Sequence, residues 1–190
     1  MRFILNEFPD DLSFEPGEEW FPLRESTNLW IIQFQALPFL IVNVVLITLI
    51  LHLIGITFHL SLYVMFTSFL LFIPVHELIH ALYFPERLSS NNIFFGFTVN
   101  GFAPFVAFFG EVKRNTYIMV LLAPFIIITL LGYIYLLLFG TNSLVEHIIF
   151  FNAIGACADC LGVWIVLRQV PKHAVLRNKK IRTYWKIPAS

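Results

Sequence analysis

Four long apolar runs dominate the chain, and polar residues gather in the segments between and beside them. A helix needs roughly 20 residues to cross about 30 Å of hydrocarbon. A polar interruption between residues 52 and 59 divides the first two runs, and GTNS at residues 140–143 divides the last two. This pattern predicts an all-α integral membrane protein with four transmembrane helices, near residues 30–53, 59–84, 117–138 and 144–167.

The segment between the second and third runs has a different pattern. It is rich in phenylalanine and is interrupted by glycine and proline, which is unusual for a solvated loop. Within it, FTV and FAP flank Asn100 and Gly101, a dipeptide that favours a type I′ turn. We therefore expect an interfacial, hairpin-like loop. Its free edge could bind an extended substrate strand, and an aromatic anchor at the interface is the alternative.

Composition supports a membrane as the solvent. The chain has 190 residues, of which 58% are hydrophobic and 13% charged, more apolar surface than a water-soluble domain of this size can bury. The net charge is zero, but acidic residues concentrate at the start and basic residues at the end. This layout divides the chain into an acidic segment (1–28), a membrane domain (29–168) and a basic tail (169–190), and it gives no nucleic-acid-binding surface.

The positions of the basic residues predict the orientation. With four spans, both termini and the loop between the second and third spans share one side of the membrane. All 12 lysine and arginine residues then fall on that side, because the two opposite connections contain none. Positive residues favour the cytoplasmic side, so we expect both termini of a multi-pass cell-membrane protein to be cytoplasmic.

The second run ends in PVHELIHALYF, which contains an HExxH motif formed by His76, Glu77 and His80. Residues four apart share one face of a helix, so both imidazoles can bind one metal ion and Glu77 can reach a water molecule beside it. Polar groups inside a span are costly unless they have partners or a task. A buried hydrogen-bonded cluster with a protonated Glu77 is the structural alternative.

A third ligand is needed, because catalytic zinc usually has three protein ligands and one open position. Asp159, in NAIGACADCLGVW, lies deep in the fourth run. Counted from the first arginine after each span, the two histidines lie 11 and 7 residues away and Asp159 lies 9 away. At 1.5 Å per residue these depths are about 16, 10 and 13 Å, which places Asp159 level with the space between His76 and His80.

The neighbours of Asp159 add further candidates. Small residues around it, Gly155 and Gly162 among them, favour close helix packing. Asn152 lies two turns earlier on the same face and could hydrogen-bond a metal ligand, the substrate or an oxyanion, or form a structural interhelical hydrogen bond. Cys157 and Cys160 have three possible roles: helix packing, metal binding or redox chemistry.

These motifs resemble known families. HELIH on a membrane helix, GFTVN in the next loop and an aspartate in a later helix resemble the site-2 protease class of intramembrane metalloproteases. More narrowly, EEWFPLRESTN, HELIHAL, LLAPFI and NAIGACAD resemble a family of bacterial membrane proteins of unknown function known as putative zincin peptidases. The resemblance implies Zn²⁺ bound by His76, His80 and Asp159, with Glu77 as the catalytic base. Site-2 proteases usually have a glycine after this aspartate, whereas Cys160 stands here.

The expected function is a zinc-dependent intramembrane metalloprotease acting on a membrane protein or peptide within the lipid bilayer. Glu77 would take a proton from the attacking water, and Asn152 or Asn100 would help to stabilise the oxyanion. Two alternatives remain: a non-catalytic zinc-binding assembly protein, and a membrane thiol oxidoreductase that uses Cys157 and Cys160. The sequence does not define an oligomeric state.

Overall fold

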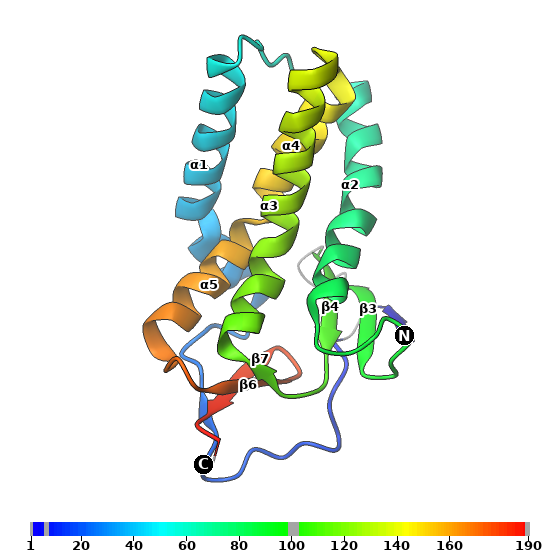
Figure 1. Cartoon of the computed structure of the whole chain (residues 1–190). Helices are drawn as coiled ribbons and strands as arrows, with labels where there is room; N and C mark the ends of the chain where they lie inside the picture. The colour runs from blue at the N-terminus through cyan, green and yellow to red at the C-terminus, as the bar shows by residue number, and fades with distance from the viewer. Residues whose placement is uncertain (1, 6–7, 99–102, 189–190) are drawn as a thin grey trace.

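Long helices form a bundle, and small sheets lie at one end of it (Figure 1). The structure is a computed structural model that describes residues 2–5, 8–98 and 103–188. Within these ranges, four helical segments are long and apolar enough to cross a membrane. They span Leu29–Leu53, Leu62–Tyr83, Arg114–Phe139 and Ser143–Gln169. The prediction of four membrane-length helical segments is therefore confirmed.

Local sequence signals define the helix ends. The Asn28 side chain caps α1 (Leu29–Leu53) by accepting a hydrogen bond from the Trp30 N–H at 3.0 Å. After α1, Gly55 has a φ of 79°, and after α3 (Arg114–Phe139) Gly140 has a φ of 83°. Glycine adopts this left-handed conformation at little cost, so both residues favour the end of a helix. The remaining full-length helix, α2, covers Leu62–Tyr83.

The fourth span consists of two helices, which corrects the prediction of one continuous helix. α4 (Ser143–Gly155) ends at a turn formed by Ala156, and α5 (Cys157–Gln169) begins directly after it. Asn142 caps α4 by accepting from two backbone N–H groups, and α5 leads from the break toward the sheet end of the bundle (Figure 1). Residues 143–169 contain no proline, so no strong helix breaker in the sequence marks the turn at Ala156.

The all-α part of the prediction is wrong, because the described residues also form seven strands in two sheets. The hairpin sheet has the order β1-β3-β4, with strands Arg2–Leu5, Ile93–Thr98 and Ala103–Phe108. The terminal sheet has the order β2-β7-β6-β5, with strands Phe21–Pro22, Arg182–Lys186, Val175–Lys179 and Val112–Lys113. Most of these strands are short and pair with distant parts of the chain, which the helical pattern does not show.

The hairpin between α2 and α3 is confirmed. β3 and β4 pair antiparallel, with Ile93 opposite Phe108 and Thr98 opposite Ala103. The turn predicted at Asn100 and Gly101 lies outside the described residues. The first strand of the chain, β1, adds in parallel to β3. β4 is therefore an edge strand in the part of this sheet that the structure describes, and it contacts α2.

The terminal sheet joins the two ends of the chain. Phe21 of β2 pairs with Trp185 of β7, and Leu23 donates its N–H to the Thr183 carbonyl at 2.9 Å. Glu25, just before α1, accepts a hydrogen bond from the Thr183 N–H at 2.6 Å. Burial raises the pKa of the Glu25 carboxyl to about 7, although this hydrogen bond and the charge of Arg182 act in the opposite direction.

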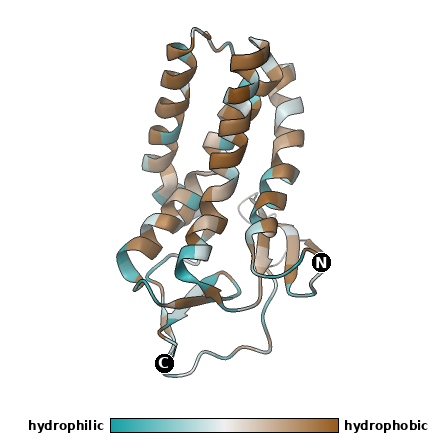
Figure 2. Ribbon diagram, viewed as in Figure 1, coloured by the Kyte–Doolittle hydropathy of each residue, from teal (hydrophilic) through white to brown (hydrophobic). Residues whose placement is uncertain are grey.

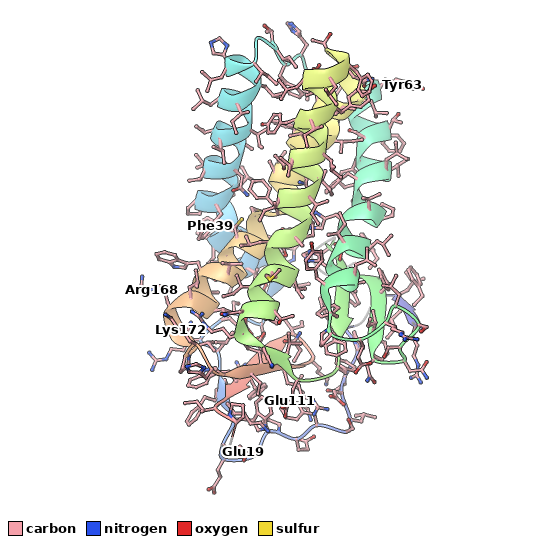
Figure 3. The ribbon with its side chains drawn as sticks, in the orientation of Figure 1. Glu19, Phe39, Tyr63, Glu111, Arg168 and Lys172 are labelled. Atoms are coloured by element: carbon pink, nitrogen blue, oxygen red, sulfur yellow. The ribbon has the colours of Figure 1, made fainter. Side chains whose placement is uncertain are left out.

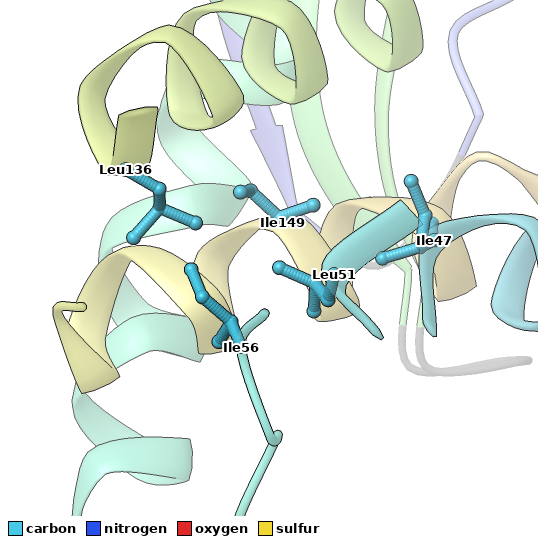
Figure 4. Close-up of a cluster of buried hydrophobic side chains, with 6 residues drawn as sticks. Ile47, Leu51, Ile56, Leu136 and Ile149 are labelled. Atoms are coloured by element: carbon cyan, nitrogen blue, oxygen red, sulfur yellow. The ribbon is translucent and has the colours of Figure 1, made fainter. Parts of the chain in front are cut away.

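At the opposite end, the helices pack around a cluster of branched aliphatic side chains (Figure 4). Its members come from α1, α3, α4 and the loop after α1: Ile47, Leu51, Ile56, Leu136 and Ile149. Gly132 of α3 permits this packing, because a Cβ atom there would lie 2.5 Å from a side-chain carbon of Ile149. The contact brings α3 and α4 together above the polar residues described below.

The outer faces of the helices are apolar, and charge gathers at the sheet end. Large exposed apolar side chains occur along the bundle, including Phe34, Ile41, Val45, Phe66, Leu70, Leu130 and Leu137. Figure 2 shows hydrophobic residues over most of the helical surface and hydrophilic residues around the terminal sheet. Figure 3 places Glu19, Glu111, Arg168 and Lys172 at that end and Tyr63 at the other. Both termini lie at the charged end (Figure 1).

Candidate metal centre

Two buried histidines and a partly buried aspartate converge between α2 and α5. His76 and His80 lie four residues apart in the last two turns of α2, on the face turned into the bundle. Asp159 lies in the first turn of α5. One ligand atom of each residue lies within 4.8 Å of those of the other two, and no other described group of three or more histidine, cysteine or acidic residues does so. The structure therefore brings together the three residues that the sequence predicted.

The ligand atoms are close enough to share one ion. The two histidine Nε2 atoms are 3.1 Å apart. The Oδ2 atom of Asp159 lies 3.2 Å from Nε2 of His76 and 3.5 Å from Nε2 of His80. Both histidines are only 5% exposed, so bulk water reaches them little.

A buried asparagine orients the first histidine. Asn152 of α4 lies 3.0 Å from Nδ1 of His76 through its Oδ1 atom. Its amide nitrogen faces three acceptors on α3, the carbonyls of Pro124 and Phe125 and the Thr129 hydroxyl, at 3.2–3.3 Å. These acceptors fix the amide orientation, so Oδ1 accepts a hydrogen bond from an Nδ1–H of His76.

A backbone carbonyl orients the second histidine in the same way. Nδ1 of His80 donates to the carbonyl oxygen of Val120 on α3 at 2.7 Å. In a neutral imidazole only one nitrogen carries a proton. Both rings therefore hold it on Nδ1 and direct an Nε2 lone pair into the site. Hydrogen bonds of this kind commonly orient the histidine ligands of protein metal sites.

The arrangement fits a divalent cation. Two imidazole lone pairs and a carboxylate face one another, and such acceptors repel unless a positive charge lies between them. Ligand atoms about 2.0–2.1 Å from a tetrahedral zinc ion lie about 3.3 Å apart, close to the observed separations. Nitrogen and carboxylate ligands suit zinc, and three protein ligands leave one position open, as in catalytic zinc sites.

Glu77 lies beside this cluster, next to the edge of the hairpin sheet. It is half-buried and is within hydrogen-bonding range of the Val106 backbone in β4. The Phe109 N–H bonds to the Asn92 carbonyl, so alternate residues of β4 pair with β3. Val106 falls between these pairs, and its backbone groups point away from β3. The edge of β4 therefore faces the carboxylate next to the first histidine.

Other predicted site residues have different positions. Asn152 is fully buried, and its polar atoms contact His76 and α3, so its position supports orienting a ligand and not binding an oxyanion. Asn100 lies outside the described residues. Neither cysteine belongs to the cluster of ligand atoms within the described chain; both are free thiols, and Cys160 contacts Asn43 of α1.

The sequence pointed to Asn152 as a possible hydrogen-bond partner of a ligand, but it did not identify the other outer contacts of the site. The Val120 carbonyl has no side-chain signature, so only the fold could reveal it. Thr129 and Asn43 were detectable in principle, because a polar side chain within an apolar helix usually has a specific partner. The identity of that partner depends on which helices are neighbours.

The fold is a bundle of membrane-length helices with two small sheets, and His76, His80 and Asp159 could together hold a metal ion. The family described as "Putative zincin peptidase" matches residues 69–175, more than half of the chain. The protein belongs to this family. The matched region contains the two histidines, Glu77 and Asp159 together with the hairpin between α2 and α3. No curated protein and no solved structure matches the chain.

Proposed function

We propose that the protein is a zinc-dependent peptidase that lies in the membrane and hydrolyses peptide bonds near the sheet end of its helix bundle. One observation supports this proposal above the others: two Nε2 lone pairs and one carboxylate converge while both Nδ1 atoms are already hydrogen-bonded. The adjacent Glu77 supplies the acid–base group that hydrolysis requires. Membership of the zincin peptidase family agrees with this chemistry.

The membrane location rests on the surface of the bundle. Exposed apolar side chains surround four helices of membrane-spanning length, and lipid would cover them. The basic residues and both termini lie at the sheet end, which we assign to the cytoplasm by the positive-inside rule. His80 is three residues from the end of α2, so the site lies near this side of the membrane.

Each residue of the site has a separate role. His76, His80 and Asp159 hold the ion, and their contacts to Asn152 and Val120 fix the two rings. A bound Zn²⁺ would polarise the peptide carbonyl and make water a better nucleophile. Glu77 takes a proton from the attacking water and then delivers it to the leaving amine, which completes the hydrolysis.

The edge of β4 is the proposed docking site for the substrate. Backbone groups of Val106 and Phe108 point away from β3, whereas Pro104 has no N–H to offer. An extended peptide that pairs with this edge would pass beside Glu77. Helical peptide bonds are shielded by their own hydrogen bonds, so the substrate must be extended or unwound where it is cut. A membrane protein or peptide with such a segment fits this edge.

The first experiment compares metal content and cleavage in the purified protein. We expect one zinc ion per chain by elemental analysis. Glu77→Gln should retain this zinc and lose cleavage by at least about 100-fold, because the substituted side chain cannot accept the proton. Products from a panel of single-span membrane peptides, identified by mass spectrometry, provide the readout. Glu146→Gln is the matched control, since Glu146 is also a helical glutamate but lies in the first turn of α4 at the opposite end.

The outcomes separate the proposed function from its two rivals. Bound zinc with equal cleavage by wild type and Glu77→Gln would favour a non-catalytic zinc protein. A thiol oxidoreductase would be favoured by two results together: thiol–disulfide exchange that the Cys157→Ser/Cys160→Ser double variant loses, and no peptide cleavage that depends on Glu77. A wild-type protein that binds no zinc would refute the metal site itself.

A further inference from the structure

A buried asparagine in α1 contacts both sides of the break between α4 and α5. Asn43 is 5% exposed, although α1 is otherwise strongly apolar. Its amide nitrogen donates to the carbonyl oxygen of Ala153, in the last turn of α4, at 3.1 Å. The same side chain lies 3.7–3.9 Å from the Cys160 sulfur, in the first turn of α5. One side chain thus joins the end of one helix to the start of the next.

The contact satisfies a backbone group that the break exposes. The last carbonyls of any helix lack their regular intrahelical partners, and an unpaired carbonyl in an apolar environment is costly. Water is scarce within a membrane, so a neighbouring helix has to provide the donor. Asn43 provides one for Ala153, which stabilises the end of α4 at Gly155.

The break decides whether Asp159 reaches the histidines. Asn152 lies before the break and contacts Nδ1 of His76, whereas Asp159 lies after it and contacts Nε2 of the same ring. The relative orientation of α4 and α5 therefore sets whether both side chains can meet one imidazole. The carboxyl of Asp159 is on a short side chain, so a small rotation of α5 would remove it from the site.

Close packing on the other side of the break limits how far it can adjust. A Cβ atom at Gly155 would lie 2.9 Å from the Phe72 ring of α2, and one at Gly162 would lie 3.1 Å from Leu121 of α3. α2 and α3 thus hold this region from one side, and α1 contacts both α4 and α5. Asn43 adds a polar contact between α1 and these two helices.

We infer that Asn43 is a positioning residue for the metal site: by holding the break between α4 and α5, it places the Asp159 carboxylate against His76 and His80. This inference rests on the proposed metal site, and it assigns a role to a residue that touches neither ligand nor substrate. It also explains the position of Cys160, which packs against Asn43 beside the break and does not face the ion.

The test measures zinc affinity and coordination in the full-length protein. Asn43→Leu keeps a branched side chain but has no donor for Ala153. We expect its zinc affinity, measured by competition with a chelator, to fall about 10-fold, the lower end of the range for residues that orient metal ligands. Tyr133→Phe is the matched control, because it removes a different hydrogen bond to α1, from the Tyr133 hydroxyl to the Ile47 carbonyl at 3.0 Å, and leaves the donor for Ala153 in place.

Cobalt substitution separates positioning from a general loss of stability. Co²⁺ binds ligands similar to those of zinc, and its visible absorption reports the coordination geometry. Asp159→Ala provides the reference spectrum of a site without the carboxylate. We expect the Asn43→Leu spectrum to shift toward this reference, whereas the Tyr133→Phe spectrum should match wild type. Asn43→Ser, whose hydroxyl is too short to replace the amide contact, repeats the measurement if the leucine variant does not fold.

Three results would overturn the inference. If the folded Asn43 variant has the zinc affinity and cobalt spectrum of Tyr133→Phe, the metal site stands but Asn43 does not position it. If wild type binds neither zinc nor cobalt, the proposed metal site fails and the inference fails with it. A shift shared by both variants would mark a general loss of stability and would also count against it.

Discussion

Among the described residues, two sites contain fully or nearly fully buried histidines, and only one of these sites has unused Nε2 lone pairs. His147, in α4 at the end opposite the sheets, donates through Nδ1 to the Ser143 carbonyl at 2.7 Å and accepts through Nε2 from the Ser61 N–H at 3.1 Å. Both of its nitrogens are satisfied by backbone groups. His76 and His80 also donate through Nδ1, yet each Nε2 faces other acceptors.

The difference shows that burial alone does not mark a functional histidine. The contacts of His147 connect the N-terminus of α2 to α4, and Phe58 packs against its ring, so its role is structural. The pair on α2 has the same local chemistry but no partner for the second nitrogen other than Asp159 and each other. The feature that indicates a metal ion is the Nε2 lone pair that has no hydrogen-bond donor, and not the residue type.

The largest expected effect concerns the ion itself. His80→Ala removes one of three ligands, so zinc affinity should fall by at least about 100-fold, beyond the range caused by outer contacts. His147→Ala should leave zinc stoichiometry at the wild-type value. Elemental analysis of both purified variants makes the comparison. Equal zinc loss in the two variants would contradict the assignment of His80 to the metal site and of His147 to a structural role.

The next effect concerns the contact that fixes the His76 ring. Asn152→Leu leaves the three ligands in place but removes the acceptor for the Nδ1–H. We expect zinc affinity to fall by about 10- to 100-fold, because the ring and its tautomer are no longer held. Chelator competition measures the change. Unchanged affinity would show that packing alone orients the ring.

Loss of the structural histidine should reduce stability instead. His147→Ala leaves the Ser61 N–H without its side-chain acceptor, which we expect to cost about 2 kcal/mol. Detergent-induced unfolding of the metal-free protein measures this change. His80→Ala is compared in the same assay with zinc bound and with zinc removed, and it should cost more stability with zinc bound, because only then does the substitution remove a ligand. The reverse order would contradict the distinction between the two sites.

The smallest effect is a pH dependence at Glu25, which contacts the terminal sheet and lies outside both histidine sites. The folded protein raises the pKa of Glu25 from 4.5 to about 7, so it favours the protonated carboxyl. This contribution to stability is fully present below about pH 4.5 and is lost as the pH rises through 7. At pH 8, Glu25→Gln should therefore be more stable than wild type by about 1 kcal/mol, since partial exposure weakens the effect. Unfolding measured at pH 5 and pH 8 tests this; an equal difference at both values would refute it.

The sequence by itself determined the features that depend on neighbouring residues. Apolar runs gave the membrane-length helical segments, the HExxH spacing placed two histidines on one face of α2, and turn chemistry gave the hairpin before α3. Depth counting also placed Asp159 level with the histidines. Each follows from a period or spacing that the chain repeats locally.

Tertiary structure alone decided which groups remain available for chemistry. Several features arise between segments far apart in the chain. They are the contact of Asn43 with the break at Ala156, the terminal sheet, and the hydrogen bonds that hold the Nδ1 protons of His76 and His80. Helical periodicity fixes the face on which a side chain lies, but not the neighbour it meets. Because a hydrogen bond depends on that neighbour to within a few tenths of an ångström, the free lone pairs of this site appear only once the helices are packed.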